Sequence, residues 1–348
     1  MKRLRIPILI LISALLLTAL SCGRADEPMS ATYYEYFDTV CYIRSYADES
    51  EESFSENCAE VEALLKEYHR LFDIYHEYDG MNNLCTVNLN AGISPVKVDR
   101  RLTEFLLYAK EMYALTDGEI NIAMGSVLSL WHGCRESAAK TPENAALPDG
   151  AELSEAAKHI SIDSIVIDES ASTVYISDTQ TSIDVGAIGK GYAAERAAEL
   201  LQQRGVSSYV LNLGGNLRAV GSKPNGDGWV TGITDPSAPS SDAFAARIIL
   251  SDSSCVTSGS YERCFTVGGK EYHHIIDKDT LFPSEHFVSV TVITRDSALA
   301  DALSTALFCM TYEDGLALCT NIGSVDAIWI KKDGSILSTE GVNEFLIK

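Results

Sequence analysis

The sequence predicts a mixed α/β or α+β fold, because helical and strand patterns alternate along the chain. Apolar residues recur at three- and four-residue spacing in several segments, and short runs rich in β-branched and aromatic residues lie between them. The chain has 348 residues, of which 46% are hydrophobic, so it can bury one large core or two modest ones. We find no internal repeat, which argues against a solenoid or a propeller.

The N-terminus has the pattern of a secretory signal peptide. Three basic residues lie among the first five, and an apolar run follows from Ile6 to Leu20. A run of this length is short for a membrane span, which needs about 20 apolar residues. Cys22 comes directly after the small residue Ser21. This order is found in lipoprotein signals, in which the cysteine is lipidated and becomes the first residue of the mature protein.

These features divide the chain into three parts. We expect a lipoprotein signal peptide at residues 1–21, a polar tether at residues 22–31 and one folded domain at residues 32–348. Lipidation of Cys22 would hold that domain at the cell membrane, on its extracytoplasmic face, as a lipid-anchored protein. Plain secretion and an uncleaved anchor are the alternatives.

The expected mature chain is strongly acidic. Cleavage after residue 21 removes three of the 27 basic residues and none of the 49 acidic ones, so the net charge changes from −22 to −25. Nucleic acid is therefore not an expected partner, and an anionic ligand needs local groups to hold it. The nine cysteines form no CxxC pair and no zinc pattern, so most are expected to be small buried hydrophobic residues.

The first half of the domain is predicted to contain a strand, two helices and an excursion. The run YFDTVCYIRSY at residues 36–46 has the β-branched and aromatic composition of a strand. Apolar residues at helical spacing predict amphipathic helices at residues 53–75 and 102–115. Residues 135–158 are rich in Ala, Glu and Pro and are expected to form a variable surface excursion.

Many short strands and two further helices are predicted beyond the excursion. The helices cover residues 189–203 and 297–310. The predicted strands cover residues 162–168, 172–177, 207–215, 228–233, 245–250, 264–269, 271–276, 287–294, 325–331 and 335–339.

A glycine-rich motif, SIDVGAIGKGYAAERAAELL at residues 182–201, stands at the start of the first of these helices. It matches neither the Walker loop nor the GxGxxG pattern of dinucleotide-binding proteins. It still offers exposed backbone N–H groups and Lys190 in the first helical turn, which together favour a phosphate. Asp184 could recognise a polar ring edge or a ribose hydroxyl. The alternative is a glycine turn that lets the helix pack closely, with Lys190 solvated.

A second motif, SALADALSTALF at residues 297–308, lies in the other helix. Asp301 and Thr305 are four residues apart, so a carboxylate and a hydroxyl project from one helix face. Two such oxygens and a backbone carbonyl, completed by phosphate oxygens and water, form a usual site for Mg²⁺. Alone, an Asp and a Thr among alanines more often belong to an ordinary helix face.

A third stretch, residues 255–277, is predicted to form a hairpin whose second strand carries His273 and His274. Strand alternation would place the two side chains on opposite faces, one toward a site and one away from it. His274 is the expected inward residue and would accept a proton near neutral pH. The alternative is a polar residue at a strand edge.

Several segments resemble those of a known family and follow in the same order. FDTVCYI, TDGEINIAMGSVLSLW and SIDVGAIGKGYA are followed by LNLGGNLRAVG, GWVTGITDP, VTSGSYER, HHIID and ADALSTALF. Each segment is a modest signal, but their common order is specific and covers nearly all of the chain after the tether. The sequence resembles the FAD:protein FMN transferases, called ApbE, which implies an ApbE-like fold of β-sheets with packed helices.

This resemblance implies a Mg²⁺-dependent flavin transferase with FAD as its substrate. Such an enzyme splits the FAD diphosphate, attaches FMN through a phosphoester to a Thr or Ser of an exported target protein, and releases AMP. The expected targets are flavin-accepting subunits or domains of membrane redox proteins. Two alternatives are an FAD pyrophosphatase that gives FMN and AMP, and a flavin- or solute-binding lipoprotein without turnover.

The resemblance also implies roles for individual residues. The Ala187 carbonyl, Asp301 and Thr305 would hold Mg²⁺, and His274 would be the base, with Asp301 as the alternative base. The residues expected to contact FAD are Phe37, Tyr78, Glu119, Ile120, Asn121, Asp184, Lys190, Ser258, Gly259 and Ile275. Tyr75 is a rival for the role of Tyr78, because the match through YHEYDGMNN is loose.

The sequence departs from the family pattern at two places. Asn121 stands where the family typically has Asp, which removes a charge and leaves amide hydrogen bonding. In HIIDKDTLFP, Lys278 and Leu281 replace a proline and a glycine. Because leucine resists a positive φ, this turn is expected to take a different path from that of the family.

Overall fold

The computed structural model describes residues 28–236, 238 and 243–347. The predicted signal peptide, Cys22 and most of the predicted tether lie outside the described residues. Among the residues that are described, no helix is both long enough and apolar enough to cross a membrane.

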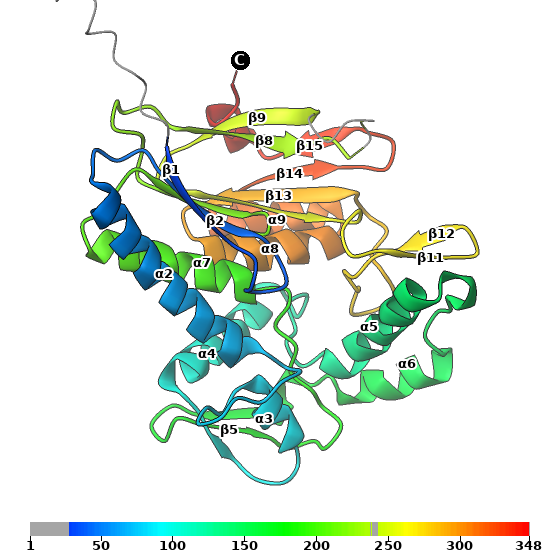
Figure 1. The fold of residues 1–348 in the computed structure, drawn as a ribbon. Coiled ribbons are helices and arrows are strands. Elements are labelled where there is room, and N and C mark those ends of the chain that lie inside the picture. Colours follow the sequence, from blue (N-terminus) through cyan, green and yellow to red (C-terminus); the bar gives the residue numbers. More distant parts are fainter. Residues whose placement is uncertain (1–27, 237, 239–242, 348) are drawn as a thin grey trace, which may run out of the picture.

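An eight-stranded antiparallel sheet lies at the centre of the molecule (Figure 1). Its strand order is β1-β2-β6-β7-β10-β13-β14-β15, so the first and last strands of the chain form its two edges. The strands are β1 Met29–Tyr33, β2 Cys41–Ser45, β6 Tyr209–Leu213, β7 Asn216–Val220, β10 Ser254–Gly259, β13 Ser289–Thr294, β14 Asp326–Ile330 and β15 Ile336–Ser338.

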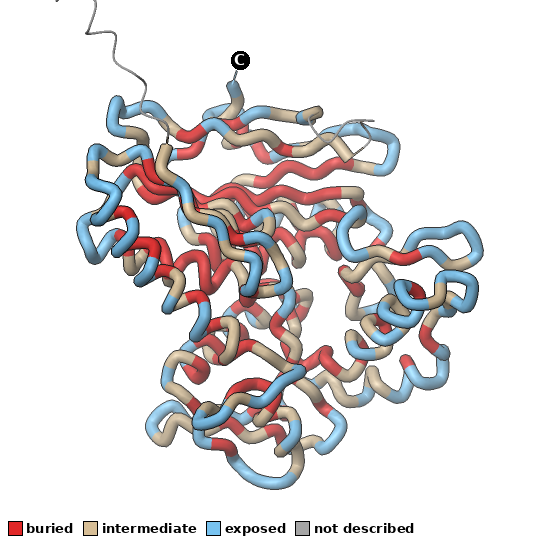
Figure 2. Tube along the Cα trace, viewed as in Figure 1, coloured by how far each residue is buried: buried red, intermediate tan, exposed pale blue. Residues whose placement is uncertain are grey.

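Helices cover one face of this sheet, and a two-stranded ribbon covers the other (Figure 1). The helices are α2 Glu51–Phe72, α7 Gly189–Gln203, α8 Ser297–Cys309 and α9 Tyr312–Ile322. The ribbon pairs β8 Trp229–Thr234 with β9 Phe244–Leu250. Because both faces of the sheet are covered, all six residues of β13 are buried, as the continuous red trace in Figure 2 shows.

A smaller layer packs beside α2 and α7. It consists of the antiparallel sheet β3-β5-β4 and of helices α3 and α4. The bounds are α3 Leu84–Leu89, β3 Val96–Lys97, α4 Arg100–Leu115, β4 Ile165–Asp168 and β5 Thr173–Ile176. Phe105 of α4 lies 4.1 Å from the Phe72 ring and 5.0 Å from the Tyr192 ring, centroid to centroid. The two layers therefore share one hydrophobic core.

An extension consists of α5 Gly125–Lys140, α6 Gly150–Ala156 and the hairpin of β11 Phe265–Val267 and β12 Lys270–Tyr272. Trp131 joins these parts, because its ring lies 6.1 Å from Tyr272 and 6.3 Å from Phe265. Four 3-10 helices complete the described structure: η1 Pro142–Asn144, η2 Ala157–His159, η3 Ile162–Ser164 and η4 Glu340–Glu344.

The predicted mixed fold is confirmed, and two helices closely match their predicted bounds. Helix α7 covers the predicted residues 189–203, and α8 ends one residue before the predicted position 310. Helix α8 begins at Ser297 because the Asp296 carboxylate accepts hydrogen bonds from the backbone N–H groups of Ala298 and Leu299.

The structure differs from the predicted boundaries at several places, three of them near the N-terminal strands and the hairpin. Strand β1 begins at Met29, so a strand occupies the last residues of the predicted tether. The predicted strand at 36–46 is only β2, because Phe37 and Asp38 have φ values of 56° and 52° and turn the chain. The predicted strand at 271–276 ends at Tyr272, so the two histidines follow the hairpin instead of belonging to it.

Some elements were not predicted. The expected excursion at 135–158 contains the end of α5 and all of α6, which the Asp149 side chain caps by accepting from two backbone N–H groups. Helices α3 and α9, the greater part of α5, and strands β3, β7 and β10 were also missed. The eight described cysteines form no disulfide, and six of them are buried, as expected of small hydrophobic residues.

Candidate active site

The glycine-rich motif forms a tight turn before α7. The Asp184 carboxylate accepts from the Gly186 N–H at 2.8 Å, and the Val185 carbonyl accepts from the Gly189 N–H at 2.9 Å. The turn is fixed to the segment before α5, because the Asp184 N–H donates to the Ile122 carbonyl at 2.9 Å. Ile188 at the N-cap has no side chain that caps the helix. Lys190 therefore lies in the first turn of a helix whose N-terminal backbone N–H groups have no capping side chain.

Helices α7 and α8 touch at Gly191. Its N–H donates to Oδ2 of Asp301 at 2.7 Å. A Cβ atom at this position would lie 2.3 Å from the Asp301 Cβ and 2.4 Å from the Ser297 carbonyl oxygen, so only glycine allows this approach. Asp301 is 4% exposed. Burial raises the pKa of its carboxyl, whereas the positive charge of Lys190, the Gly191 N–H and the Asn216 amide oppose that rise.

Hydroxyl groups surround the next turn of α8. The Ser258 Oγ at the end of β10 lies 2.8 Å from the Ser304 Oγ and 3.3 Å from the Thr305 Oγ1. The Ser304 hydroxyl donates to the Asp301 carbonyl at 3.0 Å. Thr305 is only partly buried, so its hydroxyl lies at the rim of this contact. The predicted residues Ser258, Asp301 and Thr305 are therefore brought together.

These groups fit a magnesium ion. A buried carboxylate and a hydroxyl lie one helical turn apart, and Ala187 lies in the turn just before Lys190. The described residues contain no group of three or more His, Cys, Asp or Glu side chains that could enclose a metal. Mg²⁺ tolerates such a sparse site, because it usually takes one or two carboxylates and completes its shell with water and phosphate oxygens.

His274 lies close to the same place. Its Nδ1 is 3.2 Å from the Glu262 carbonyl oxygen, which can only accept, so Nδ1 carries the proton and Nε2 remains as an acceptor. Burial, together with the charges of Arg263 and Lys190, lowers the pKa of His274 to about 3. The imidazole is therefore neutral at physiological pH.

His273 faces other surroundings. Its Nε2 lies 2.9 Å from the Ser284 carbonyl oxygen, and its ring meets the edge of Phe308 at 5.5 Å. The two histidines thus separate toward a polar site and a packed core, although the strand that was expected to separate them ends at Tyr272.

A group of residues around Asp184 was missed by the sequence analysis, apart from Tyr75. His132 stacks on Tyr75 with 5.4 Å between ring centroids, and its Nδ1 lies 2.7 Å from Nη2 of Arg135. Burial raises the pKa of Asp184, and the charges of His132, Arg263 and Arg135 oppose this. Arg263 stands in the quoted VTSGSYER segment and could have been considered as a site residue from the sequence. His132 and Arg135 lie at or beside the expected excursion, where no site residue was expected.

Two predicted aromatic residues lie elsewhere around the turn. The Tyr78 hydroxyl donates to Asp73 at 2.8 Å, and its ring lies under the Arg70 guanidinium at 4.6 Å. No described contact joins Tyr78 to the residues around Asp184. The alternative residue, Tyr75, does lie among them. The Phe37 N–H donates to the His69 Nδ1 at 3.2 Å, and the Phe37 ring meets the His69 ring edge at 5.7 Å.

The predicted segment 119–121 forms part of the scaffold. Glu119 pairs with Lys278 at 3.3 Å, and Ile120 is buried. The Asn121 amide donates to the Ile160 carbonyl at 2.8 Å and accepts from the Ala123 N–H at 2.9 Å. Asn121 thus uses both ends of its amide within the loop.

The predicted residues Gly259 and Ile275 lie on either side of the hairpin. A Cβ atom at Gly259 would lie 2.7 Å from the Tyr261 ring, so that ring packs directly on the glycine. Ile275 is buried, and its carbonyl accepts from the Ser284 N–H at 3.0 Å.

The premise that Leu281 would avoid a positive φ was wrong. Leu281 adopts a φ of 63°, so the turn keeps the conformation that a glycine would favour. The Leu281 N–H donates to the Asp277 carbonyl at 2.9 Å, and the Leu281 carbonyl accepts from Nε1 of Trp131 at 2.9 Å. These two hydrogen bonds offset the steric cost of the left-handed backbone.

The chain is similar to known proteins over most of its length. The profile of the ApbE family matches residues 37–329. An FAD:protein FMN transferase of Treponema pallidum is 32% identical over 352 residues, which cover 94% of this chain and 92% of that protein. A protein of the same name from Klebsiella pneumoniae is 30% identical over 279 residues, with 79% and 82% covered.

Solved structures show the same fold. The ApbE protein from Thermotoga maritima superposes with a TM-score of 0.80 and 26% identity, covering 92% of this chain and 100% of that one. The flavin transferase ApbE from Vibrio cholerae gives a TM-score of 0.75 and 23% identity, with the same coverage. The expected ApbE-like fold is confirmed, and the chain belongs to the ApbE family.

Proposed function

We propose that this protein is a Mg²⁺-dependent FAD:protein FMN transferase. It would split the diphosphate of FAD, join FMN through a phosphoester to a Thr or Ser hydroxyl of an exported protein, and release AMP. The observation that carries this proposal is the buried Asp301 carboxylate, held at 2.7 Å by the Gly191 N–H beside Lys190, with the Thr305 hydroxyl one turn further along α8.

The residues at the α7–α8 contact would bind the diphosphate. Asp301, Thr305 and the Ala187 carbonyl would hold Mg²⁺, which supplies positive charge to a diphosphate when bound. Lys190 would bind a phosphate oxygen from the other side. Its ammonium group lies close enough to Asp301 to lower the pKa of that carboxyl, so the two charges already share one site.

His274 is our candidate for the base. The hydroxyl oxygen of the acceptor would form a bond to the phosphorus on the FMN side, and the bond from this phosphorus to the bridging oxygen would break. AMP leaves with the bridging oxygen, and the hydroxyl proton passes to Nε2 of His274, which is neutral and free to accept it. Asp301 is the alternative base.

Residues on the Asp184 side would hold the rest of FAD. Asp184 would bind a polar group of the cofactor, and aromatic rings near it would pack on the flavin. The Tyr75–His132 stack favours Tyr75 over Tyr78 for this role. Phe37, the segment Glu119–Asn121, Ser258, Gly259 and Ile275 would complete the pocket.

The N-terminal pattern supports a location outside the cytoplasm. Residues 1–21 would be a lipoprotein signal peptide, and a lipid on Cys22 would anchor the domain to the cell membrane through the short segment before β1. At that location the enzyme would meet flavin-accepting subunits or domains of membrane redox proteins.

One experiment separates this function from its two alternatives. The purified full chain in detergent is incubated with FAD and Mg²⁺, with and without a flavin-acceptor domain, and AMP and protein-bound flavin are measured. A transferase releases AMP in step with flavin retained on the acceptor, a pyrophosphatase releases AMP without an acceptor, and a binding protein releases none. Asp301→Ala should abolish both products; unchanged transfer by this variant would remove the metal assignment.

A further inference from the structure

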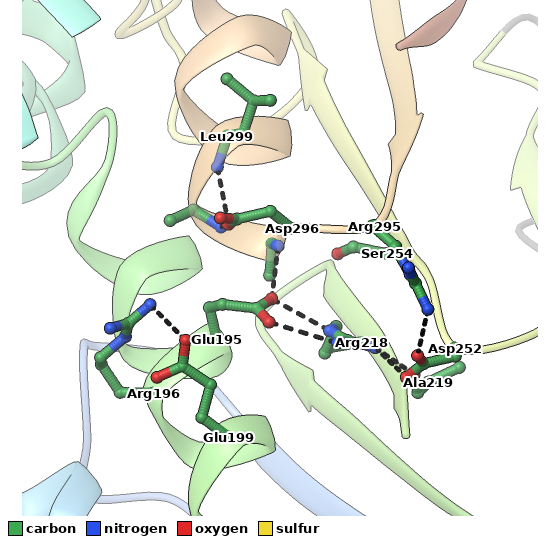
Figure 3. Close-up of polar contacts among 12 residues, drawn as sticks. Glu195, Arg196, Glu199, Arg218, Ala219, Asp252, Ser254, Arg295, Asp296 and Leu299 are labelled. Carbon is green, nitrogen blue, oxygen red and sulfur yellow. Dashed lines mark hydrogen bonds and ion pairs between the residues drawn. The ribbon is translucent and has the colours of Figure 1, made fainter. Parts of the chain in front are cut away.

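A buried ion pair joins α7 to β7 (Figure 3), one helical turn along α7 from Gly191. Glu195 of α7 and Arg218 of β7 form two hydrogen bonds, Nε to Oε2 at 2.9 Å and Nη2 to Oε1 at 3.2 Å. Their side chains are 8% and 4% exposed. Two charges are therefore held in the core, close to the helices that carry Lys190 and Asp301.

The carboxylate of Glu195 also binds the start of α8. Oε2 accepts from the Ser297 N–H at 2.6 Å, which is the first backbone N–H of that helix. The Asp296 side chain accepts from the next two N–H groups. Ser297 thus obtains its partner from a different helix, whereas its neighbours are capped locally.

Two contacts one turn apart fix α7 against α8. Gly191 and Glu195 are four residues apart on α7, and Ser297 and Asp301 are four residues apart on α8. Gly191 binds Asp301 at 2.7 Å, and Glu195 binds Ser297 at 2.6 Å. A slide or rotation of one helix would break both contacts, so the pair of contacts defines the register of the two helices.

The pair is anchored on its far side as well. Arg218 donates to Asp252 at 3.2 Å and to the Ala219 carbonyl, and Asp252 pairs with Arg295 at 3.2 Å (Figure 3). Burial disfavours the charge of Arg218, but its contacts with Glu195 and Asp252 raise the pKa of the guanidinium. The direction of the Glu195 carboxylate is thereby set by the central sheet.

Stability alone does not require such a pair. Buried ion pairs can often be replaced by apolar side chains of similar volume without loss of stability, since desolvation offsets their attraction. A metal and a diphosphate, in contrast, need their ligands placed within about 0.5 Å.

We propose that Glu195 and Arg218 are positioning residues, which fix the register of α7 against α8 so that Lys190 and Asp301 address one bound diphosphate and its metal ion. This inference rests on the proposed function. Neither residue touches the substrate; both act through Ser297 and Gly191.

Two variants separate positioning from a structural role. Glu195→Gln keeps an oxygen that can accept from the Ser297 N–H. It removes the negative charge that balances the buried Arg218 guanidinium, and so lowers the free energy of unfolding. The double change Glu195→Leu with Arg218→Met removes both charges and keeps apolar volume, but it removes the acceptor for Ser297. A positioning role therefore predicts opposite orders: Glu195→Gln is the less stable protein, and the double variant is the poorer binder of Mg²⁺.

The measurements are the melting temperature, the kinetics of FMN transfer and a titration independent of turnover. In the titration, Mg²⁺ is added to each full-length variant with FAD, and quenching of flavin fluorescence is followed. We expect the Mg²⁺ midpoint of the double variant to rise roughly 10-fold or more, with a matching fall in kcat. Glu195→Gln should stay closer to the wild-type midpoint despite its lower melting temperature.

Glu199→Gln is the matched control. Glu199 lies one turn further along α7 and pairs with Arg196 at 2.7 Å in a partly exposed position (Figure 3). Its loss should change neither the Mg²⁺ midpoint nor the rate.

Two outcomes would overturn the inference. One is a double variant with the wild-type midpoint and rate, and the other is a midpoint that follows melting temperature across the series. If the wild-type protein releases no AMP and transfers no flavin, the proposed function fails instead, and the fluorescence titration still tests the positioning role by itself.

Discussion

Gly191 is the residue at which the candidate site is most sensitive to a single methyl group. A Cβ atom there would collide with the Asp301 side chain and the Ser297 carbonyl at 2.3 and 2.4 Å. Gly133 in α5 offers a control, because no neighbouring atom of the described residues lies within 4 Å of the position that a Cβ would take. The same chemical change therefore has opposite expected effects at these two helical glycines.

We predict that Gly191→Ala lowers the free energy of unfolding by about 1–3 kcal/mol, because it forces α7 and α8 apart. FMN transfer should fall with it, since Asp301 loses its place against the α7 backbone. Gly133→Ala should raise stability by up to about 1 kcal/mol, because alanine is the better helix former. Urea unfolding and transfer assays on both variants test this; a Gly191→Ala protein as stable and active as wild type would contradict the close contact.

The protonation of His274 gives a second prediction at this scale. Burial, Arg263 and Lys190 lower its pKa to about 3, so the ring remains a neutral base from neutral pH down to about pH 5. We therefore expect the pH profile of kcat/KM for FMN transfer to show no fall in activity near pH 6.5, where an ordinary histidine would become protonated.

His274→Gln should lower kcat by roughly 10²- to 10⁴-fold at neutral pH, the usual contribution of a general base. His273→Gln is the control, since His273 faces Ser284 and Phe308. A wild-type profile that falls with an apparent pKa near 6.5, or a His274→Gln enzyme with normal kcat, would argue for a different base.

The individual site residues were predictable to different degrees. Asp301 and Thr305 stand four residues apart in one helix, so their mutual placement follows from helical geometry, whereas Lys190 meets them only through the contact of α7 with α8. Tyr75 and Tyr78 lie in an irregular segment, where no period decides which ring turns toward Asp184. Leu281 shows a further limit, because a hydrogen bond from Trp131, distant in sequence, stabilises a backbone conformation that leucine disfavours alone.

At the scale of elements, most of the described strands and the helices α2, α4, α7 and α8 were predicted, whereas α3, α5, α6 and α9 were not. Helix α7 has a long alanine-rich pattern after glycines, and α8 has a capping Asp296, so local signals define both. Helix α6 has one buried apolar residue, Leu153, and gave no period to detect. Strand β12 ends before the histidines because His273 binds the Ser284 backbone outside the hairpin, a contact that no local pattern encodes.

The connection between β9 and β10 allows a test of electrostatic stabilisation. Asp252 has a φ of 44°, which asparagine also tolerates, so Asp252→Asn changes the charge and keeps the backbone. Burial disfavours its charge, but Arg218, the Gly221 N–H and Arg295 together lower the pKa of the folded-state carboxyl.

A lowered pKa stabilises the fold above the unfolded-state pKa, which is about 3.9, and this stabilisation disappears as the pH falls through the folded-state pKa. Asp252→Asn should therefore be less stable than wild type by about 0.2–1 kcal/mol at pH 7. The difference should shrink below about pH 4. Unfolding curves of both proteins at several pH values check this. A difference that does not depend on pH would exclude the charge as its origin.

At the scale of the whole molecule, the fold class was predictable but the strand order was not. Alternating patterns indicate sheets with packed helices, whereas the pairing of β2 with β6 and of β7 with β10 joins segments far apart in the chain. The site depends on this order, because β7 carries Arg218 and β10 carries Ser258, and both reach α7 or α8 only in the assembled sheet.

The proposed lipid anchor makes a prediction for the whole protein. Cys22→Ala should release the protein from the membrane fraction, because a lipidated cysteine supplies the membrane-binding chains. FMN transfer to an acceptor by the detergent-solubilised variant should be unchanged, because no proposed active-site residue precedes Phe37 in the chain. Cell fractionation and intact mass measure both effects. A variant that stays fully membrane-bound would show that another part of the chain anchors it.

The proposed reaction depends on where a metal ion and the FAD diphosphate bind. The most direct measurement is a crystal structure with FAD and Mn²⁺ in place of Mg²⁺, in which anomalous scattering locates the metal. We predict an anomalous peak about 2.0–2.4 Å from a carboxylate oxygen of Asp301, the Thr305 hydroxyl and the Ala187 carbonyl, with the diphosphate between the metal and Lys190. A metal peak away from Asp301, or a diphosphate that does not reach Lys190, would contradict the proposal.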